Sequence, residues 1–207
     1  NIFRPRQSSE SSEWSDVLRF RYNKLKRAER LLVEKWTESD LPDLTRIERH
    51  QSLRWAILQH YQVCSTPLLD VTHSLRVAAS FAADNNNSHE AILYVIAVPQ
   101  ISGAITASAE AGLQILRLSS ICPPSALRPH FQEGYLLGHY PDLQSVEEKE
   151  NYKLYEVDFA KRLLCKFRLN LEHFWRPHFQ IVPHAALYPQ RGDSLLEIAE
   201  QIENELS

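Results

Sequence analysis

The sequence predicts an α+β fold in which a mixed β-sheet is flanked by helices and the N-terminal half is helical. Apolar residues recur at steps of three and four over residues 14–36, which is typical of an amphipathic helix. The uninterrupted apolar run 91–98 is short and rich in Ile and Val, which favours a buried strand, and Pro99 ends it. Residues 163–169 alternate between apolar and polar, as a half-buried strand does.

Three later helices are predicted from residues that can cap a helix N-terminus. Asp43 is expected to cap a second helix that ends near Tyr61. Ser74 is expected to cap a third helix, and Ser194 to cap the last one in a capping box with Glu197. The third and last helices would cover residues 75–83 and 193–206.

The length of 207 residues and a hydrophobic content of 43% predict one well-packed domain over residues 1–207. Its parts would be a helical subregion over 14–62, a sheet core over 91–169 and the terminal helix. An acidic, exposed connection is expected at 146–151. The strands of the sheet are expected at 2–6, 91–98, 113–118, 134–138 and 163–169.

Composition excludes several classes of function. The formal net charge of −3 argues against a protein that coats nucleic acid, although one face of the first helix is basic. A solvated helix face is the preferred interpretation of those charges, and a face for a phosphate-bearing partner is the alternative. No apolar run reaches the roughly 18 residues that a membrane span needs, so no membrane association is expected. Three widely separated cysteines predict a reducing cytoplasm, and the scattered histidines predict no metal site.

The stretch 57–83 concentrates polar residues inside an otherwise apolar sequence. A buried polar group must find a partner or belong to a site, because its desolvation is otherwise uncompensated. Candidate site residues are therefore expected here, and they are His60, Tyr61, Ser65, Thr66, Asp70 and Thr72.

Several motifs resemble the FRG domain, a bacterial family named for a Phe-Arg-Gly motif. Gln59-His60-Tyr61 followed by Thr66-Pro67-Leu68-Leu69-Asp70-Val71-Thr72 resembles its central motif. Arg128, Gln132, Gly134 and Tyr135 are similar to a later motif, and an aromatic-Pro step precedes the last helix. The opening motif would be Phe3-Arg4-Pro5, in which Pro5 stands where the family has Gly.

The resemblance implies an ADP-ribosyltransferase-like fold and a reaction on NAD, as in bacterial defence or toxin effectors. NAD would be a substrate, and the acceptor would be an unknown macromolecule, either protein or nucleic acid. Breaking the nicotinamide–ribose bond builds positive charge on the ribose, so the site needs a carboxylate or an amide that holds the ribose hydroxyls and orients the nucleophile, and a cation that positions the phosphates. The implied catalytic residues are Arg4, His60 and Glu133, and the implied substrate-binding residues are Tyr61, Thr66, Asp70, Thr72, Arg128 and Gln132.

Each role has a structural alternative. His60 and Asp70 could form a buried pair that only holds the central stretch together, and Arg4 could pair with a surface carboxylate. Gln132 can bind a ribose but cannot take a proton, so an outward-facing Glu133 would leave the site inactive. The alternative function is therefore a non-catalytic module that senses a nucleotide or a partner with the same pocket. The pocket is expected where the central stretch faces Arg4 and Gln132.

Overall fold

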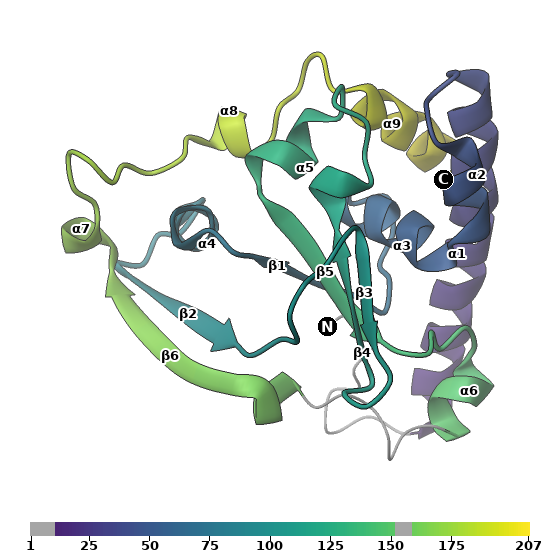
Figure 1. Cartoon of the computed structure of the whole chain (residues 1–207), viewed down its shortest axis with the longest axis horizontal. Coiled ribbons are helices and arrows are strands. Elements are labelled where there is room, and N and C mark those ends of the chain that lie inside the picture. The colour runs from purple at the N-terminus through teal and green to yellow at the C-terminus, as the bar shows by residue number, and fades with distance from the viewer. Residues whose placement is uncertain (1–10, 152–158) are drawn as a thin grey trace.

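The computed structural model describes residues 11–151 and 159–207, and it confirms the α+β class. A group of helices lies on one side of a four-stranded antiparallel sheet, and a two-stranded antiparallel sheet lies on the other side (Figure 1). The predicted strand 2–6 lies outside the described residues.

The long N-terminal helix α1 (Ser11–Glu38) is the amphipathic helix that the periodicity predicts. The helices α3 (Gln51–His60) and α9 (Ser194–Leu206) pack against it, and the core between them continues to one face of the four-stranded sheet. The predicted apolar stripe of α1 is buried at Leu18, Tyr22, Leu25, Ala28, Leu32 and Trp36.

Where the sequence predicts one helix over 43–61, the structure has α2 (Leu44–Arg49) and α3, separated by His50 in an extended conformation. Asp43 precedes α2 with a left-handed backbone (φ 62°), and its side chain makes no capping hydrogen bond. The expected cap is therefore wrong, and only the carbonyl oxygen of Asp43 accepts from the first turn.

The two other expected caps have different outcomes. Ser74 does cap α4 (Leu75–Ala83), because its side chain accepts a hydrogen bond from the backbone N–H of Val77. At α9 the prediction is one residue late, since Asp193 is the cap and Ser194 is already helical. Asp193 accepts from two backbone N–H groups of the first turn, which a carboxylate does at least as well as a hydroxyl.

The predicted single mixed sheet is wrong, because the described strands form two separate sheets and every pairing is antiparallel. The larger sheet has the order β1 (Leu69–Thr72), β5 (Gly134–His139), β4 (Leu113–Arg117) and β3 (Ile105–Ser108). The smaller one pairs β2 (Glu90–Ile96) with β6 (Leu163–Asn170). The prediction missed β1 and β3, because four residues are too few to show a period.

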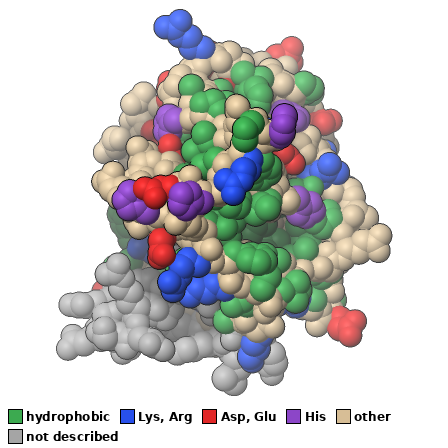
Figure 2. Space-filling view, turned by 90° about the vertical axis from the view of Figure 1, so that its left-hand side faces the viewer, with side chains coloured by type: hydrophobic (Ala, Val, Ile, Leu, Met, Phe, Trp, Pro, Cys, Tyr) green, Lys and Arg blue, Asp and Glu red, His purple; other side chains and the backbone are tan. Residues whose placement is uncertain are grey.

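The two-stranded sheet is also more exposed than predicted. Tyr94 on β2 is 58% exposed, and Leu164 and Phe167 on β6 are 70% and 50% exposed. The α4 helix covers only part of this sheet, so apolar side chains remain at the surface. Figure 2 shows hydrophobic side chains gathered across the middle of the face that contains these strands.

Short helices complete the chain, and one of them, α6 (Val146–Asn151), is the predicted acidic connection. It is less exposed than predicted, because Val146 and Lys149 are buried. Within the described ranges, no helix is both long and apolar enough to cross a membrane. The other short elements are η1 (Leu118–Ser120), α5 (Leu127–Phe131), η3 (Phe159–Arg162), α7 (Leu171–Phe174) and α8 (His184–Leu187).

Candidate functional site

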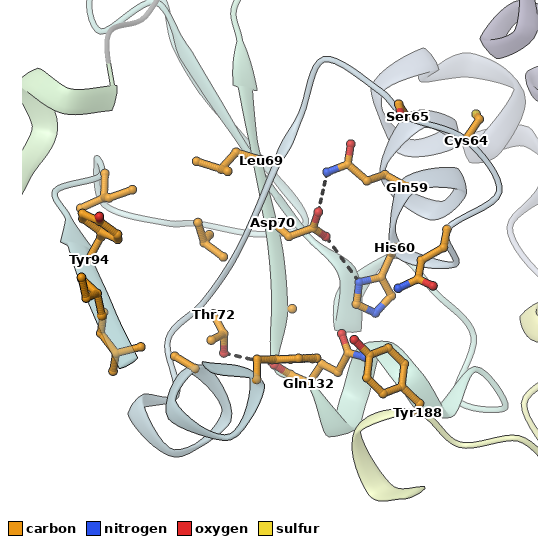
Figure 3. Close-up of a pocket in the computed structure, with 18 residues that line it drawn as sticks. Gln59, His60, Cys64, Ser65, Leu69, Asp70, Thr72, Tyr94, Gln132 and Tyr188 are labelled. Carbon is orange, nitrogen blue, oxygen red and sulfur yellow. Dashed lines mark hydrogen bonds and ion pairs between the residues drawn. The ribbon is translucent and has the colours of Figure 1, made fainter. Parts of the chain in front are cut away.

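A pocket of about 820 Å³ lies between the end of α3, strand β1, helix α4 and strand β2 (Figure 3). The structure thereby brings the central stretch and Gln132 together at one cavity, which is the place expected for the pocket. Polar groups gather on the side of α3 and β1, whereas the β2 side is mostly apolar.

The amide of Gln59 organises the polar side of the pocket. Its Nε2 donates to the backbone carbonyl of Leu68 at 3.1 Å and to the carboxylate of Asp70, and its Oε1 accepts from the Thr66 hydroxyl. Strand β1 holds Asp70 in the pocket wall with its side chain 54% exposed. The sequence marked Gln59 only as part of a motif, so its role in orienting Asp70 was missed.

His60 is the last residue of α3, and its side chain is 4% exposed. Its Nδ1 lies 3.8 Å from Asp70 Oδ1, while its Nε2 has no hydrogen-bond partner among the described residues. A Cβ at Gly134 would stand only 3.1 Å from the ring carbon Cε1, so β5 approaches His60 closely because it has glycine there. The site therefore contains a buried imidazole beside an accessible carboxylate.

Arg128 lies behind the pocket wall and does not line the cavity. Its Nη1 donates to the carbonyl of His60 at 3.1 Å, which secures the end of α3. Its guanidinium carbon is 5.1 Å from the ring centre of Tyr61 and 5.2 Å from that of Tyr188. Arg128 is thus placed to position His60 and Tyr188 rather than to touch a ligand.

Tyr61 and Thr66 are also placed as supporting residues. The Tyr61 hydroxyl donates to the Asp193 carboxylate at 2.8 Å, and the pKa of Tyr61 is raised by burial and by the charge of Asp193. Asp193 also accepts from the backbone N–H of Arg128 at 2.8 Å. Thr66 is fully buried and holds Gln59. Neither Tyr61 nor Thr66 lines the pocket, although both were predicted to bind substrate.

Thr72 and Gln132 both line the pocket. The Thr72 hydroxyl donates to the carbonyl of Gln132 at 3.1 Å, so β1 is tied to the end of α5. The Gln132 side chain donates to the carbonyl of Leu187 at 2.8 Å, which leaves its amide oxygen for a ligand.

The structure does not bring Glu133 to the pocket. This residue follows the end of α5 with a left-handed backbone (φ 47°), and its side chain is exposed. The turn that leads the chain from α5 into β5 sends neighbouring side chains in opposite directions, so Gln132 faces inward and Glu133 faces solvent. Arg4, the other residue expected to act in catalysis, lies outside the described residues.

Aromatic residues that the sequence did not single out form the rest of the wall. Phe81 on α4 meets Tyr188 edge to face with ring centres 5.7 Å apart, and Tyr94 lies across the cavity on β2 (Figure 3). Tyr188 was marked by the aromatic-Pro step, and Tyr94 was read only as part of a buried strand. These rings offer flat apolar surfaces to a heterocyclic ligand.

Asp70 and His60 are the carboxylate and the imidazole that line the pocket, and no Lys or Arg is found among its described lining residues. Cys64 also lines the cavity, but burial raises the pKa of its thiol to about 12, so it stays protonated at neutral pH. No group of three His, Cys, Asp or Glu side chains that could hold a metal occurs within the part of the chain that the structure describes.

The comparisons with known proteins find one similarity, over the N-terminal part of the chain. Residues 1–91 match the family model of the FRG domain, which confirms the predicted resemblance over that part of the chain. The match includes Gln59, His60 and Asp70, and it ends before Gln132 and Tyr188. No curated protein and no solved structure matches the chain.

Proposed function

We propose that the chain is an ADP-ribosyltransferase-like effector that binds NAD in this pocket and breaks its nicotinamide–ribose bond. It would act in the cytoplasm, as in bacterial defence or toxin systems. The observation that carries the proposal is the cluster of Gln59, Asp70 and His60 at the wall of a pocket of about 820 Å³. The aromatic wall supports it, because it suits a flat heterocycle.

In this reaction the bond between ribose C1′ and the pyridinium nitrogen breaks, and its electron pair leaves with neutral nicotinamide. The ribose becomes oxocarbenium-like, and a nearby fixed carboxylate stabilises that charge. Asp70 is the accessible carboxylate of the pocket, and Gln59 fixes its orientation. An oxygen of the acceptor, or water, then bonds to C1′ and loses a proton.

His60 is the group proposed to accept that proton at Nδ1, because this nitrogen lies 3.8 Å from the accessible Asp70 carboxylate, whereas Nε2 is buried. Asp70 would therefore take the carboxylate role that the sequence assigned to Glu133. Gln132 would hold a ribose hydroxyl through its amide oxygen. The phosphates would need a cation, and Arg4 is the residue proposed to supply it.

The second candidate is a non-catalytic module that senses a nucleotide or a partner. The specific observation in its favour is the absence of Lys and Arg from the described lining residues, which leaves the phosphates of NAD to Arg4. The amide of Gln59 is also already engaged within the protein, as a rigid binding site requires.

The test is nicotinamide released from NAD by the purified chain, measured with and without cell lysate. Asp70→Asn keeps the shape of the side chain and the contact with Gln59 while it removes the charge. We expect it to lower the rate by about 10²-fold or more, as losing one stabilising group in an active site does. His60→Gln is expected to lower the rate by about 10²-fold.

Two further variants make the result specific. Glu200→Gln removes an exposed carboxylate on α9 and serves as the charge-matched control. Glu133→Gln separates the assignments, because a loss in this variant with full activity in Asp70→Asn would overturn the role given to Asp70. NAD binding without any release would favour the sensing module, and absence of binding would exclude NAD as the ligand.

A further inference from the structure

A second cavity of about 310 Å³ adjoins the candidate pocket. It lies between the end of β1, the start of α4, the β2–β6 sheet and the face of the four-stranded sheet that carries Ile115 and Tyr135. Six residues line both cavities, so the two share a wall: Val71, Thr72, Ala78, Leu93, Tyr94 and Ile96. Whatever enters the second cavity therefore lies next to the ligand of the first.

The chemistry of the second cavity differs from that of the first. None of the described residues that line it is Lys, Arg, Asp or Glu. Its imidazole, that of His73, stacks on the ring of Tyr135 with ring centres 4.3 Å apart. An apolar cavity gains free energy by burying an apolar group, and it offers no counter-charge to a phosphate. The cavity therefore suits an apolar side chain rather than a nucleic acid backbone.

The rim of the cavity extends this apolar character to the surface. Leu75, Val95 and Phe167 line the cavity and are 54%, 39% and 50% exposed. Exposed apolar surface is also found further along β6 at Leu163, and Figure 2 shows hydrophobic side chains across the face that contains this strand. Contiguous exposed apolar surface is typical of protein-binding sites, where charged residues are depleted at the centre.

We infer that the second cavity receives a large apolar side chain of a protein partner, and that this partner is the acceptor of ADP-ribose. The shared wall would place the residue to be modified beside the ribose in the first pocket. The role as acceptor rests on the proposed NAD reaction, whereas the binding of an apolar side chain does not. The inference thus selects protein over nucleic acid as the class of acceptor.

The first test measures binding of a simple probe, N-acetyl-L-phenylalaninamide, by NMR chemical-shift titration. We expect saturable shifts at the cavity residues in the unmodified chain. Phe167→Lys should weaken probe binding by about fivefold or more, because it puts a charge at the rim. Leu164→Lys is the matched control, since it makes the same kind of change on the same strand outside both cavities. Absence of saturable binding, or equal weakening by both variants, would overturn the inference.

The second test asks what is modified, using NAD that carries biotin on its adenine and a bacterial lysate. Two results together would support the inference: the label is removed by protease, and protein labelling falls about tenfold in Phe167→Lys but not in Leu164→Lys. Label removed by nuclease, or protein labelling unaffected by Phe167→Lys, would overturn it. If the chain releases no nicotinamide at all, the proposed function and the acceptor role both fail, and probe binding alone decides whether the cavity takes an apolar side chain.

Discussion

Replacement of Asp193 by Ala tests how the C-terminal helix supports the pocket. The Asp193 side chain is buried and caps α9, and it also accepts from the Tyr61 hydroxyl and from the backbone N–H of Arg128. Through these bonds one carboxylate joins the end of α3, the start of α5 and the start of α9. The residue is therefore expected to matter for stability although it touches no ligand.

The expected cost can be summed from the lost bonds. Loss of the helix cap costs about 1 kcal/mol. Leaving the buried Tyr61 hydroxyl and the Arg128 N–H without acceptors costs about 1–3 kcal/mol each. Removing a buried charge returns part of this sum, so we expect Asp193→Ala to lower the free energy of unfolding by about 3–5 kcal/mol.

The assay is urea unfolding followed by tryptophan fluorescence and by circular dichroism. The control is Ser194→Ala, whose hydroxyl shares a hydrogen bond of 2.7 Å with the exposed Ser125 hydroxyl, and it should cost about 0.5 kcal/mol or less. Tyr61→Phe should reduce the cost of Asp193→Ala by about 1 kcal/mol, because no orphan hydroxyl remains. A loss below about 1.5 kcal/mol in Asp193→Ala, or an equal loss in Ser194→Ala, would refute the reasoning.

Three further predictions concern stability. Burial raises the pKa of Asp142 to about 6. The stability tied to its protonated form is therefore complete below about pH 4 and is lost as the pH rises through 6. In urea titrations, Asp142→Asn should raise the free energy of unfolding by about 2 kcal/mol at pH 8 and change it little at pH 4. A Cβ at Gly138 would stand 2.5 Å from the buried Leu68 side chain, whereas a Cβ at Gly134 would stand 3.1 Å from its nearest atoms. Gly138→Ala should therefore cost about 2–3 kcal/mol and lower the melting temperature more than Gly134→Ala does. The reverse order would contradict the packing argument. Glu29 accepts from the Arg54 guanidinium and the Trp55 indole, so Glu29→Gln should cost about 3 kcal/mol in thermal unfolding.

The sequence predicted local structure where an apolar period extended over several turns or where a capping residue preceded a helix. The stripe of α1 and the cap at Ser74 were confirmed, because burial of one helix face and a side-chain cap are local properties. Asp43 was wrong as a cap, since a left-handed backbone cannot be read from the residue type alone. The short strand β1 was hidden inside the stretch that the sequence marked as polar.

For the site, the sequence identified the segments that meet but not which of their side chains face the cavity. Asp70 and His60 were marked because polar residues stand out in an apolar stretch. Glu133 and Gln132 are neighbours in the chain, and only the turn between α5 and β5 decides which one points inward. Tyr94 gave no sign of a site, since an aromatic residue within an apolar run is read as part of the core.

The amino-acid sequence alone thus determined the α+β class, the amphipathic first helix, the resemblance to the FRG domain and the polar stretch that carries Asp70 and His60. Only the tertiary structure decided that the strands form two antiparallel sheets, that Asp193 joins three helices and that the two cavities share a wall. The physical reason is that periodicity and capping act between neighbours in the chain. Strand pairing, the direction of a side chain at a turn and the shape of a cavity depend on residues that are distant in the sequence.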